Sequence, residues 1–336
     1  MAARTRYAPD RGLTVRMTAT MFLLGLVFVV FVGLVIGIMT AAHASAASII
    51  LIAVIFGGGS AFISLFYSDK IALAAAGARE VSPKEAPALH GIVDRLCALA
   101  DMDKPRIAIA PASMPNAFAT GRNSKNSVLC VTQGLLHGSD LTQEELEGVL
   151  AHELSHVAHK DVQVMTYASL LAIVAGLLVR FAFYSEIFGG GRRGGGNNQA
   201  ALLIPLIMLA SAVVYAISFL LIRVLSRYRE LAADRSGALL TQNPSALISA
   251  LTKVSQGMNR IPTQDLRKAE TLNAFYFAPA MKMQLTGRGG RGGGGGGGKS
   301  LSALFSTHPS LDKRIEQLEK IQRELGQVDS DPRGLR

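Results

Sequence analysis

Two long runs without a charged residue constrain this chain most. Met17–Thr40 and Ala44–Ser68 contain no Asp, Glu, Lys or Arg, and a helix needs only about 20 apolar residues to cross a hydrocarbon core. Two further apolar segments, Val164–Phe188 and Ala200–Ile222, follow later. Hydrophobic residues make up 49% of the chain and charged residues only 17%, which is unusual for a water-soluble protein. We therefore predict four transmembrane helices.

Basic residues flank these segments mainly on one side of the predicted membrane. They precede the first segment, follow the second and follow the fourth: Arg4, Arg6, Arg11, Arg16, Lys70, Arg223, Arg227 and Arg229. Lys and Arg are enriched in cytoplasmic loops, so both termini and residues 69–161 are predicted to be cytoplasmic. Arg192 and Arg193 lie on the opposite side and go against this pattern, but they are outnumbered.

The segment between the second and third apolar runs is predicted to be a compact α+β unit. Residues 83–100 have helical periodicity, and residues 106–110, 117–120 and 128–132 are typical of short strands separated by turn residues. Helical stretches are also predicted at 226–240, 244–256 and 309–325. The whole chain is therefore expected to be α+β, mainly α.

A motif on the helix that follows Thr142 indicates a metal site. Thr142 and Glu145 fit a capping box, and His152-Glu153-Leu154-Ser155-His156 follows within the predicted helix. Two histidines four residues apart lie on one helical face, so both rings can reach one ion. Glu153 lies beside them, where a carboxylate can accept a proton from water. This is the H-E-x-x-H pattern of zinc hydrolases.

A catalytic zinc site needs a third protein ligand. His159 is too close to His156 on the same helix to complete a tetrahedron, and we interpret it as a surface residue at the helix end. Glu230 and Asp234 are four residues apart on one helical face, which suits Glu230 as the ligand and Asp234 as the partner of a ligand histidine. The alternative is an ordinary charged stretch beside the membrane, with both carboxylates paired to neighbouring arginines.

These motifs resemble the gluzincin metalloproteases, specifically the HtpX-like membrane peptidases related to the CAAX prenyl proteases. The resemblance rests on H-E-x-x-H followed by Glu-x-x-Ala-Asp at Glu230–Asp234, on Pro115–Gly121, which is similar to the family's substrate-binding edge strand, and on Ser306–Ser310, which is similar to its late histidine motif. It covers about residues 17–325. The glycine-rich loop at 287–298 and the glycine-arginine insert at 189–196 depart from the family pattern.

The resemblance implies one Zn²⁺ per chain, held by His152, His156 and Glu230, with Asp234 behind a ligand histidine. Glu153 is then expected to be the general base. His308 is expected to donate a hydrogen bond to the oxyanion of the tetrahedral intermediate. Asn116 and Ala117 are expected to lie on an exposed strand that pairs with an extended substrate.

The resemblance also gives the organisation along the chain. We expect five parts: a basic tail (1–16), a transmembrane hairpin (17–68), a first protease part with the edge strand and the H-E-x-x-H helix (69–161), a second transmembrane pair (162–222) and a second protease part (223–336). The active site would then be at the cytoplasmic surface of the cell membrane.

The expected partners are the lipid bilayer and membrane-protein substrates, in a quality-control role that the resemblance implies. One alternative is a prenyl-protein or signal-processing peptidase of the same zinc class, and another is a non-catalytic membrane scaffold, which predicts a missing base or ligand. The net charge of +10 raises a nucleic-acid binder as a third. No nucleic-acid partner is expected, because the basic residues flank the apolar segments. The sequence leaves the oligomeric state open.

Overall fold

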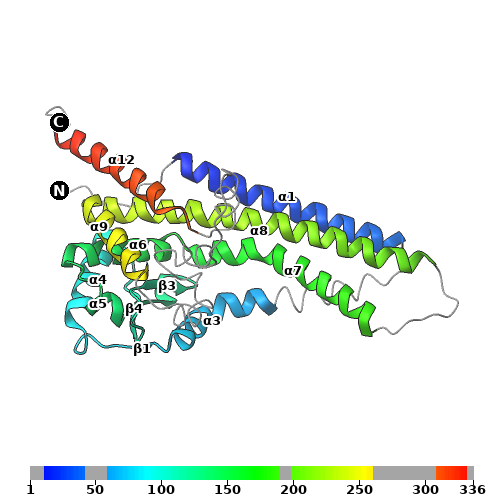
Figure 1. Ribbon diagram of the computed structural model, residues 1–336, viewed down its shortest axis with the longest axis horizontal. Helices are drawn as coiled ribbons and strands as arrows, with labels where there is room; N and C mark the ends of the chain where they lie inside the picture. Colours follow the sequence, from blue (N-terminus) through cyan, green and yellow to red (C-terminus); the bar gives the residue numbers. More distant parts are fainter. Residues whose placement is uncertain (1–10, 42–58, 189–197, 260–307, 331–336) are drawn as a thin grey trace, which may run out of the picture. The chain divides into compact units, whose positions relative to one another are not determined.

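The computed structural model describes residues 11–41, 59–188, 198–259 and 308–330 (Figure 1). Most of these residues are helical and the rest include one small sheet, so the mainly α, α+β class is confirmed for the described part of the chain. Residues 42–58 of the predicted transmembrane hairpin, the insert at 189–196 and the glycine-rich segment at 287–298 lie outside the described residues.

The elements follow one another along the chain as helices interrupted by a cluster of strands (Figure 1). The helices are α1 (Arg11–Ala41), α3 (Gly59–Ala76), α4 (Pro87–Ala100), α5 (Gln133–His137), α6 (Gln143–Ala158), α7 (Asp161–Phe188), α8 (Asn198–Thr241), α9 (Pro244–Asn259) and α12 (Leu311–Ser330). The strands are β1 (Arg79–Glu80), β2 (Arg106–Ala110), β3 (Ala117–Gly121) and β4 (Ser127–Thr132).

The chain divides into two compact units. The mixed unit, which holds the sheet, comprises Met1–Thr14, Phe66–Val162 and Ser226–Arg336. The helical unit comprises Val15–Leu65 and Gln163–Leu225. Each unit is therefore built from separate stretches of the chain, and α7 and α8 each contribute to both.

The helical unit contains apolar helices with little internal burial. Two helical segments among the described residues, Arg11–Leu34 and Pro205–Thr241, are long and apolar enough to cross a membrane. Only 17% and 11% of their most apolar windows are buried, so most of those side chains face outward. A small cluster around Leu24, Phe31 and Leu225 packs the helices of this unit together. The prediction of four membrane helices is thus supported for two segments, and the other two remain predictions.

The sheet of the mixed unit has the strand order β1-β2-β4-β3. β2 and β4 are parallel, while β1 and β3 are antiparallel to their neighbours. Every residue of β4 is buried, because helices cover both faces of the sheet. Among the described strands β3 pairs with β4 alone, as Ala117 opposite Val131 and Ala119 opposite Leu129. No described strand pairs with its other edge, where the Ala119 N–H donates to the side chain of Glu153.

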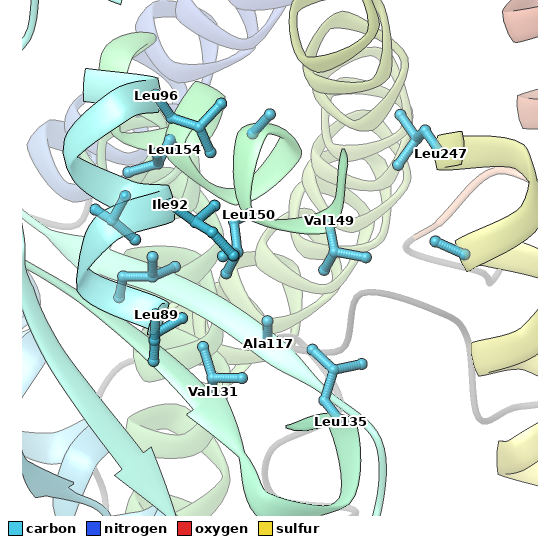
Figure 2. Close-up of a cluster of buried hydrophobic side chains, with 14 of the residues drawn as sticks. Leu89, Ile92, Leu96, Ala117, Val131, Leu135, Val149, Leu150, Leu154 and Leu247 are labelled. Atoms are coloured by element: carbon cyan, nitrogen blue, oxygen red, sulfur yellow. The ribbon is translucent and has the colours of Figure 1, made fainter. Parts of the chain in front are cut away.

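The larger core lies between the sheet and the helices on one of its faces. Leu89, Ile92 and Leu96 of α4 and Val149, Leu150 and Leu154 of α6 converge on the sheet residues Ala117 and Val131 (Figure 2). Leu247 of α9 and Leu318 of α12 belong to the same cluster. This packing fixes α6 against β3, which brings the H-E-x-x-H motif beside the edge strand.

The helix that carries the motif begins and ends at defined residues. The capping box predicted at Thr142 and Glu145 is present, with each side chain bonded to the other residue's backbone N–H. α6 ends at Ala158, His159 caps it, and Lys160 has a left-handed backbone with φ of 55°. α7 then begins at Asp161. The motif helix therefore does not continue into α7 but turns sharply before it.

The chain that enters β3 is held by one hydroxyl group. Thr132 Oγ1 accepts a hydrogen bond from the Asn116 N–H at 2.9 Å and lies 2.7 Å from the Met114 carbonyl oxygen, to which it donates. Gly134 allows this close approach, because a Cβ there would lie 2.0 Å from the Ser113 carbonyl oxygen. Residues 114–116 are thereby fixed immediately before the edge strand.

Candidate metal centre

The two histidines of the motif face each other across one turn of α6. His152 Nε2 lies 3.2 Å from His156 Nε2, and the two rings are nearly perpendicular. Two nitrogen ligands of one tetrahedral zinc ion would be about 3.3 Å apart, given Zn–N bonds of about 2.0–2.1 Å. The predicted convergence of the two rings is therefore present in the structure.

Glu230 of α8 brings a carboxylate to the same point. Its oxygens lie 3.8 Å from His152 Nε2 and 3.5 Å from His156 Nε2, and the three ligand atoms lie within 4.8 Å of one another. α8 can approach α6 this closely because of Gly237, where a Cβ would lie only 2.9 Å from the His152 backbone nitrogen. Any larger residue at 237 would push the two helices apart.

The second nitrogen of His152 contacts a carboxylate that is itself held by an arginine. His152 Nδ1 lies 2.9 Å from Asp234 Oδ1. Arg314 of α12 donates to both oxygens of Asp234, at 2.7 Å and 2.6 Å, and is fully buried. Because a carboxylate only accepts hydrogen bonds, Nδ1 of His152 carries the proton and its Nε2 offers a lone pair. Asp234 thus lies where the sequence predicted the partner of a ligand histidine.

His156 has a similar partner on its far side. Its Nδ1 lies 2.5 Å from Asp161 Oδ2, and Arg229 Nη2 donates to the same oxygen at 2.7 Å. Asp161 is 2% exposed. The proton of His156 is therefore also drawn to Nδ1, which directs the Nε2 lone pair toward His152.

These residues fit a bound cation. Two imidazole lone pairs 3.2 Å apart repel each other unless a positive charge, carried by a proton or a metal ion, lies between them. Glu230 Oε2 is also buried, with His308 Nδ1 at 3.1 Å and Arg314 Nη1 at 3.9 Å, so its negative charge faces this point. Two nitrogens and a carboxylate oxygen, backed by hydrogen-bonded carboxylates, are a donor set that suits zinc.

The side chain of Glu153 leaves α6 toward β3 and is buried. It is 4% exposed, and its Oε2 accepts a hydrogen bond from the Ala119 N–H at 3.1 Å. Burial, with a smaller contribution from Glu230, raises the pKa of Glu153 to about 8, although His156 and the Ala119 hydrogen bond act in the opposite direction. Burial lowers the pKa of His152, an effect that Asp234 partly offsets.

The remaining predicted residues lie at different distances from this cluster. His308 Nδ1 is 3.1 Å from Glu230 Oε2, so His308 joins the cluster directly. Asn116 lies immediately before the edge strand, and Ala117 is the first residue of β3. Both are buried and not exposed as expected, because helices including α6 pack against this part of the sheet. The interpretation of His159 as a surface residue is wrong: it caps α6 at the expected helix end, but its ring is half-buried, with Nε2 3.3 Å from Ser236 Oγ, because α8 packs over it.

Three charged residues of the site were not predicted from the sequence. Arg314, Asp161 and Arg229 reach the ligand cluster through space, and only Asp161 is near the motif in the chain. A single sequence carries little signal for Arg314, because its contact with Asp234 of α8 depends on how α12 packs. Arg229 was expected to be a membrane-flanking charge or, in the alternative interpretation, a partner of Glu230 and Asp234. It pairs instead with Asp161.

The chain is similar to one peptidase family and to several known proteins. The model of peptidase family M48 matches residues 83–322. A protein called Protease HtpX homolog 1 from Streptomyces coelicolor is 52% identical over 325 residues, covering 97% of this chain and 98% of that protein. Protease HtpX homolog from Moorella thermoacetica is 46% identical over 322 residues, covering 96% and 98%. The crystal structure of S. mikatae Ste24p matches with a TM-score of 0.45 and 16% identity, over 92% of this chain and 66% of that chain.

Proposed function

Because the chain belongs to peptidase family M48 and is a metalloprotease, we propose that His152, His156 and Glu230 hold one zinc ion for the hydrolysis of peptide bonds in membrane proteins. The observation that carries this proposal is the convergence of the three ligand atoms within 4.8 Å. A bound zinc ion supplies Lewis-acid chemistry, which polarises a peptide carbonyl group and lowers the pKa of water.

In this proposal Asp234, the carboxylate behind His152, orients that ligand. Asp234, fixed by two hydrogen bonds from Arg314, keeps the proton of His152 on Nδ1. Such partners fix the tautomer and ring orientation of ligand histidines. The ring then presents Nε2 to the metal without reorganisation.

Glu153 is the proposed general base. It takes a proton from the attacking water and passes it to the leaving amine. Its position supports this role, since one oxygen is engaged by Ala119 N–H while the side chain lies among His152, His156 and the edge strand. His308, held beside Glu230, is proposed to donate a hydrogen bond to the developing oxyanion.

The open edge of β3 is proposed to bind the substrate backbone. Residues in an antiparallel pair alternate between those that bond to the neighbour and those that face away. Asn116 accepts from Thr132 N–H, whereas Ala119 N–H points to Glu153, so Ala117 and Ala119 turn their backbone groups to the open edge. An extended peptide that adds to this edge lies beside Glu153, and Asn116 is proposed to bind its amide group.

We further propose that the mixed unit is a cytoplasmic protease domain and that the helical unit is embedded in the cell membrane through four helices. Outward-facing apolar side chains on Arg11–Leu34 and Pro205–Thr241 support membrane insertion. The basic flanks support the cytoplasmic side. A site built on the ends of α7 and α8 is close in the chain to the apolar segments, which favours misfolded membrane proteins as substrates in quality control.

Cleavage by purified protein with and without a chelator tests this function. The protein in lipid nanodiscs is expected to cleave an unfolded membrane-protein substrate, to lose that activity after zinc is chelated, and to regain it when zinc is returned. His159→Ala provides a matched histidine variant on the same helix and is expected to respond to the chelator as the wild type does. Cleavage that persists unchanged after complete zinc removal would contradict the proposal.

A further inference from the structure

The carboxylate behind His156 comes from the first residue of α7. Asp161 Oδ2 lies 2.5 Å from His156 Nδ1 and 2.7 Å from Arg229 Nη2, so one oxygen holds both groups. All three side chains are largely withdrawn from solvent, with exposures of 14% for His156, 2% for Asp161 and 11% for Arg229. A charge pair this buried is stable only when its partners stay in place.

A break in the helix is what brings Asp161 to His156. In a continuous helix, residues five apart differ by about 140° around the axis, so their side chains would point in different directions. Here α6 ends at Ala158 and Lys160 takes a left-handed conformation with φ of 55°. The chain turns back at this point, and Asp161 faces the ring of His156.

The arrangement repeats the one behind His152. Each histidine has its Nδ1 against an aspartate, and each aspartate is held by an arginine: Asp234 by Arg314, and Asp161 by Arg229. Both sets use α8, which supplies Asp234 to one and Arg229 to the other, while α12 supplies Arg314 and the start of α7 supplies Asp161. The aspartates thus come from different helices, and their common placement against Nδ1 indicates that each histidine ring has to be held in orientation.

We propose that Asp161 and Arg229 form a positioning pair for His156, which holds its ring so that Nε2 faces the metal. The inference rests on the metal site proposed above and extends it to the junction between α6 and α7. Arg229 keeps Asp161 charged and fixed, Asp161 fixes the tautomer and rotation of His156, and the left-handed residue at 160 sets their distance.

A purely structural role for Asp161 predicts a different result. An aspartate in the first turn of a helix stabilises that helix by interacting with its positive end. If Asp161 did only this, its removal would lower the stability of the protein but leave the affinity for zinc unchanged once the protein is folded. Metal affinity and ligand geometry therefore distinguish the two roles.

The test measures zinc affinity, by competition with a chromogenic chelator, on the full-length protein in detergent. Asp161→Ala is expected to bind zinc about 10–100-fold more weakly than the wild type. Asp161→Asn keeps an acceptor oxygen but loses the charge. Its zinc affinity is expected to lie between those of the wild type and Asp161→Ala. The visible absorption spectrum of cobalt-substituted protein is expected to change in both variants, because the geometry at His156 changes.

A matched control lies on α6, the helix that carries His156. Glu145 of α6 pairs with Lys253 and does not contact the metal cluster. Glu145→Gln removes a carboxylate ion pair in the same way and is expected to reduce thermal stability while leaving zinc affinity and the cobalt spectrum unchanged. Thermal unfolding of each zinc-free variant reports separately on the fold.

Substitutions at Lys160 test the importance of the distance between Asp161 and His156 without altering Asp161 itself. Its side chain is exposed, so substitutions there act through the backbone. Lys160→Gly accepts a positive φ without strain and is expected to keep wild-type zinc affinity. Lys160→Val is unfavourable at positive φ, so it is expected to displace Asp161 and weaken zinc binding.

The outcomes separate this inference from the function it rests on. Wild-type protein that binds no zinc would overturn the metal site itself. Wild-type protein that binds zinc, together with Asp161→Ala and Asp161→Asn variants of unchanged affinity and cobalt spectrum, would overturn the positioning pair alone. If Asp161→Ala does not fold, the Asp161→Asn and Lys160 variants still decide the question.

Discussion

Two glutamates of the site differ in their surroundings. Glu230 points one oxygen at each ligand histidine, whereas Glu153 accepts a hydrogen bond from the edge strand. Glu153 is next to His152 in the sequence, so its side chain leaves α6 about 100° around the axis from that ring. These surroundings fit the proposed roles, in which Glu230 binds the metal and Glu153 moves a proton.

Replacing Glu153 by glutamine separates these functions. The amide has the same size and still accepts the Ala119 hydrogen bond, but it cannot take a proton at neutral pH. We expect Glu153→Gln to fold and to keep zinc, with cleavage reduced by at least about 10²–10⁴-fold. The measurement is the rate of cleavage of a membrane substrate beside the metal content of the same preparation.

A control for this variant is Glu147→Gln, on the same helix, where the carboxylate pairs with Arg95 and lies away from the cluster. It should cleave at the wild-type rate. If Glu153→Gln also cleaved at the wild-type rate, Glu153 would not be the base.

The site residues that the sequence could predict are those with regular local spacing. His152, Glu153 and His156 lie within one helical turn, and Glu230 with Asp234 repeats that spacing. Arg314 and Arg229 could not be predicted as site residues, because their contacts depend on how α8 and α12 pack. Asp161 was missed because its approach to His156 needs a helix break at Lys160, and no glycine or proline in the sequence predicts that break.

At the level of elements, the edge strand positions the site from one side and α6 from the other. Ala117 is fully buried, and Ala119 donates to Glu153. Any peptide paired with β3 therefore extends past the proposed base. Within the described residues no strand occupies this edge, because β4 lies on the other side of β3.

Proline at position 117 tests the role of the edge. Ala117→Pro removes a backbone N–H that faces away from β4, a place where an edge strand tolerates proline. We expect the variant to fold and retain zinc, while the KM for a membrane substrate rises and cleavage efficiency falls by about 10-fold, as for the loss of one hydrogen bond of about 1.5 kcal/mol.

The opposite edge of the same sheet offers a control. Val81 N–H donates to Ile107, so the N–H of Glu80 in β1 faces outward as that of Ala117 does. Glu80→Pro should leave cleavage unchanged. Equal efficiency of the folded Ala117→Pro variant and the wild type would count against substrate pairing at β3.

The elements themselves were largely predictable. β2, β3 and β4 lie within one residue of the predicted strands, and the capping box begins α6 where expected. β1 and α5 were missed, since a two-residue strand and a five-residue helix have no periodicity to detect. Their formation depends on pairing with β2 and on the Thr132 cap.

For the whole molecule, the mixed unit is assembled from stretches on both sides of α7 and α8. The apolar composition predicted the membrane class. Which separate stretches of the chain assemble into each unit depends on long-range packing, which sequence periodicity does not reveal. The proposed topology places both termini in the cytoplasm.

Cysteine labelling in intact cells tests that topology. Cys97 and Cys130 are both buried and unpaired, so they give little background. Single cysteines added at either terminus are expected to resist a membrane-impermeant maleimide until the cells are permeabilised. A cysteine in the 189–196 insert is expected to react from outside. Efficient external labelling of both termini would reverse the orientation.

Metal analysis tests the central claim most directly. It is best done in a Glu153→Gln background, where self-cleavage cannot remove the protein. We expect about one zinc per chain, as for a three-ligand catalytic site, and almost none after His152→Ala and Glu230→Ala are added together. Stoichiometric zinc retained by that variant, folded and purified in the same way, would show that the metal is not held by His152, His156 and Glu230.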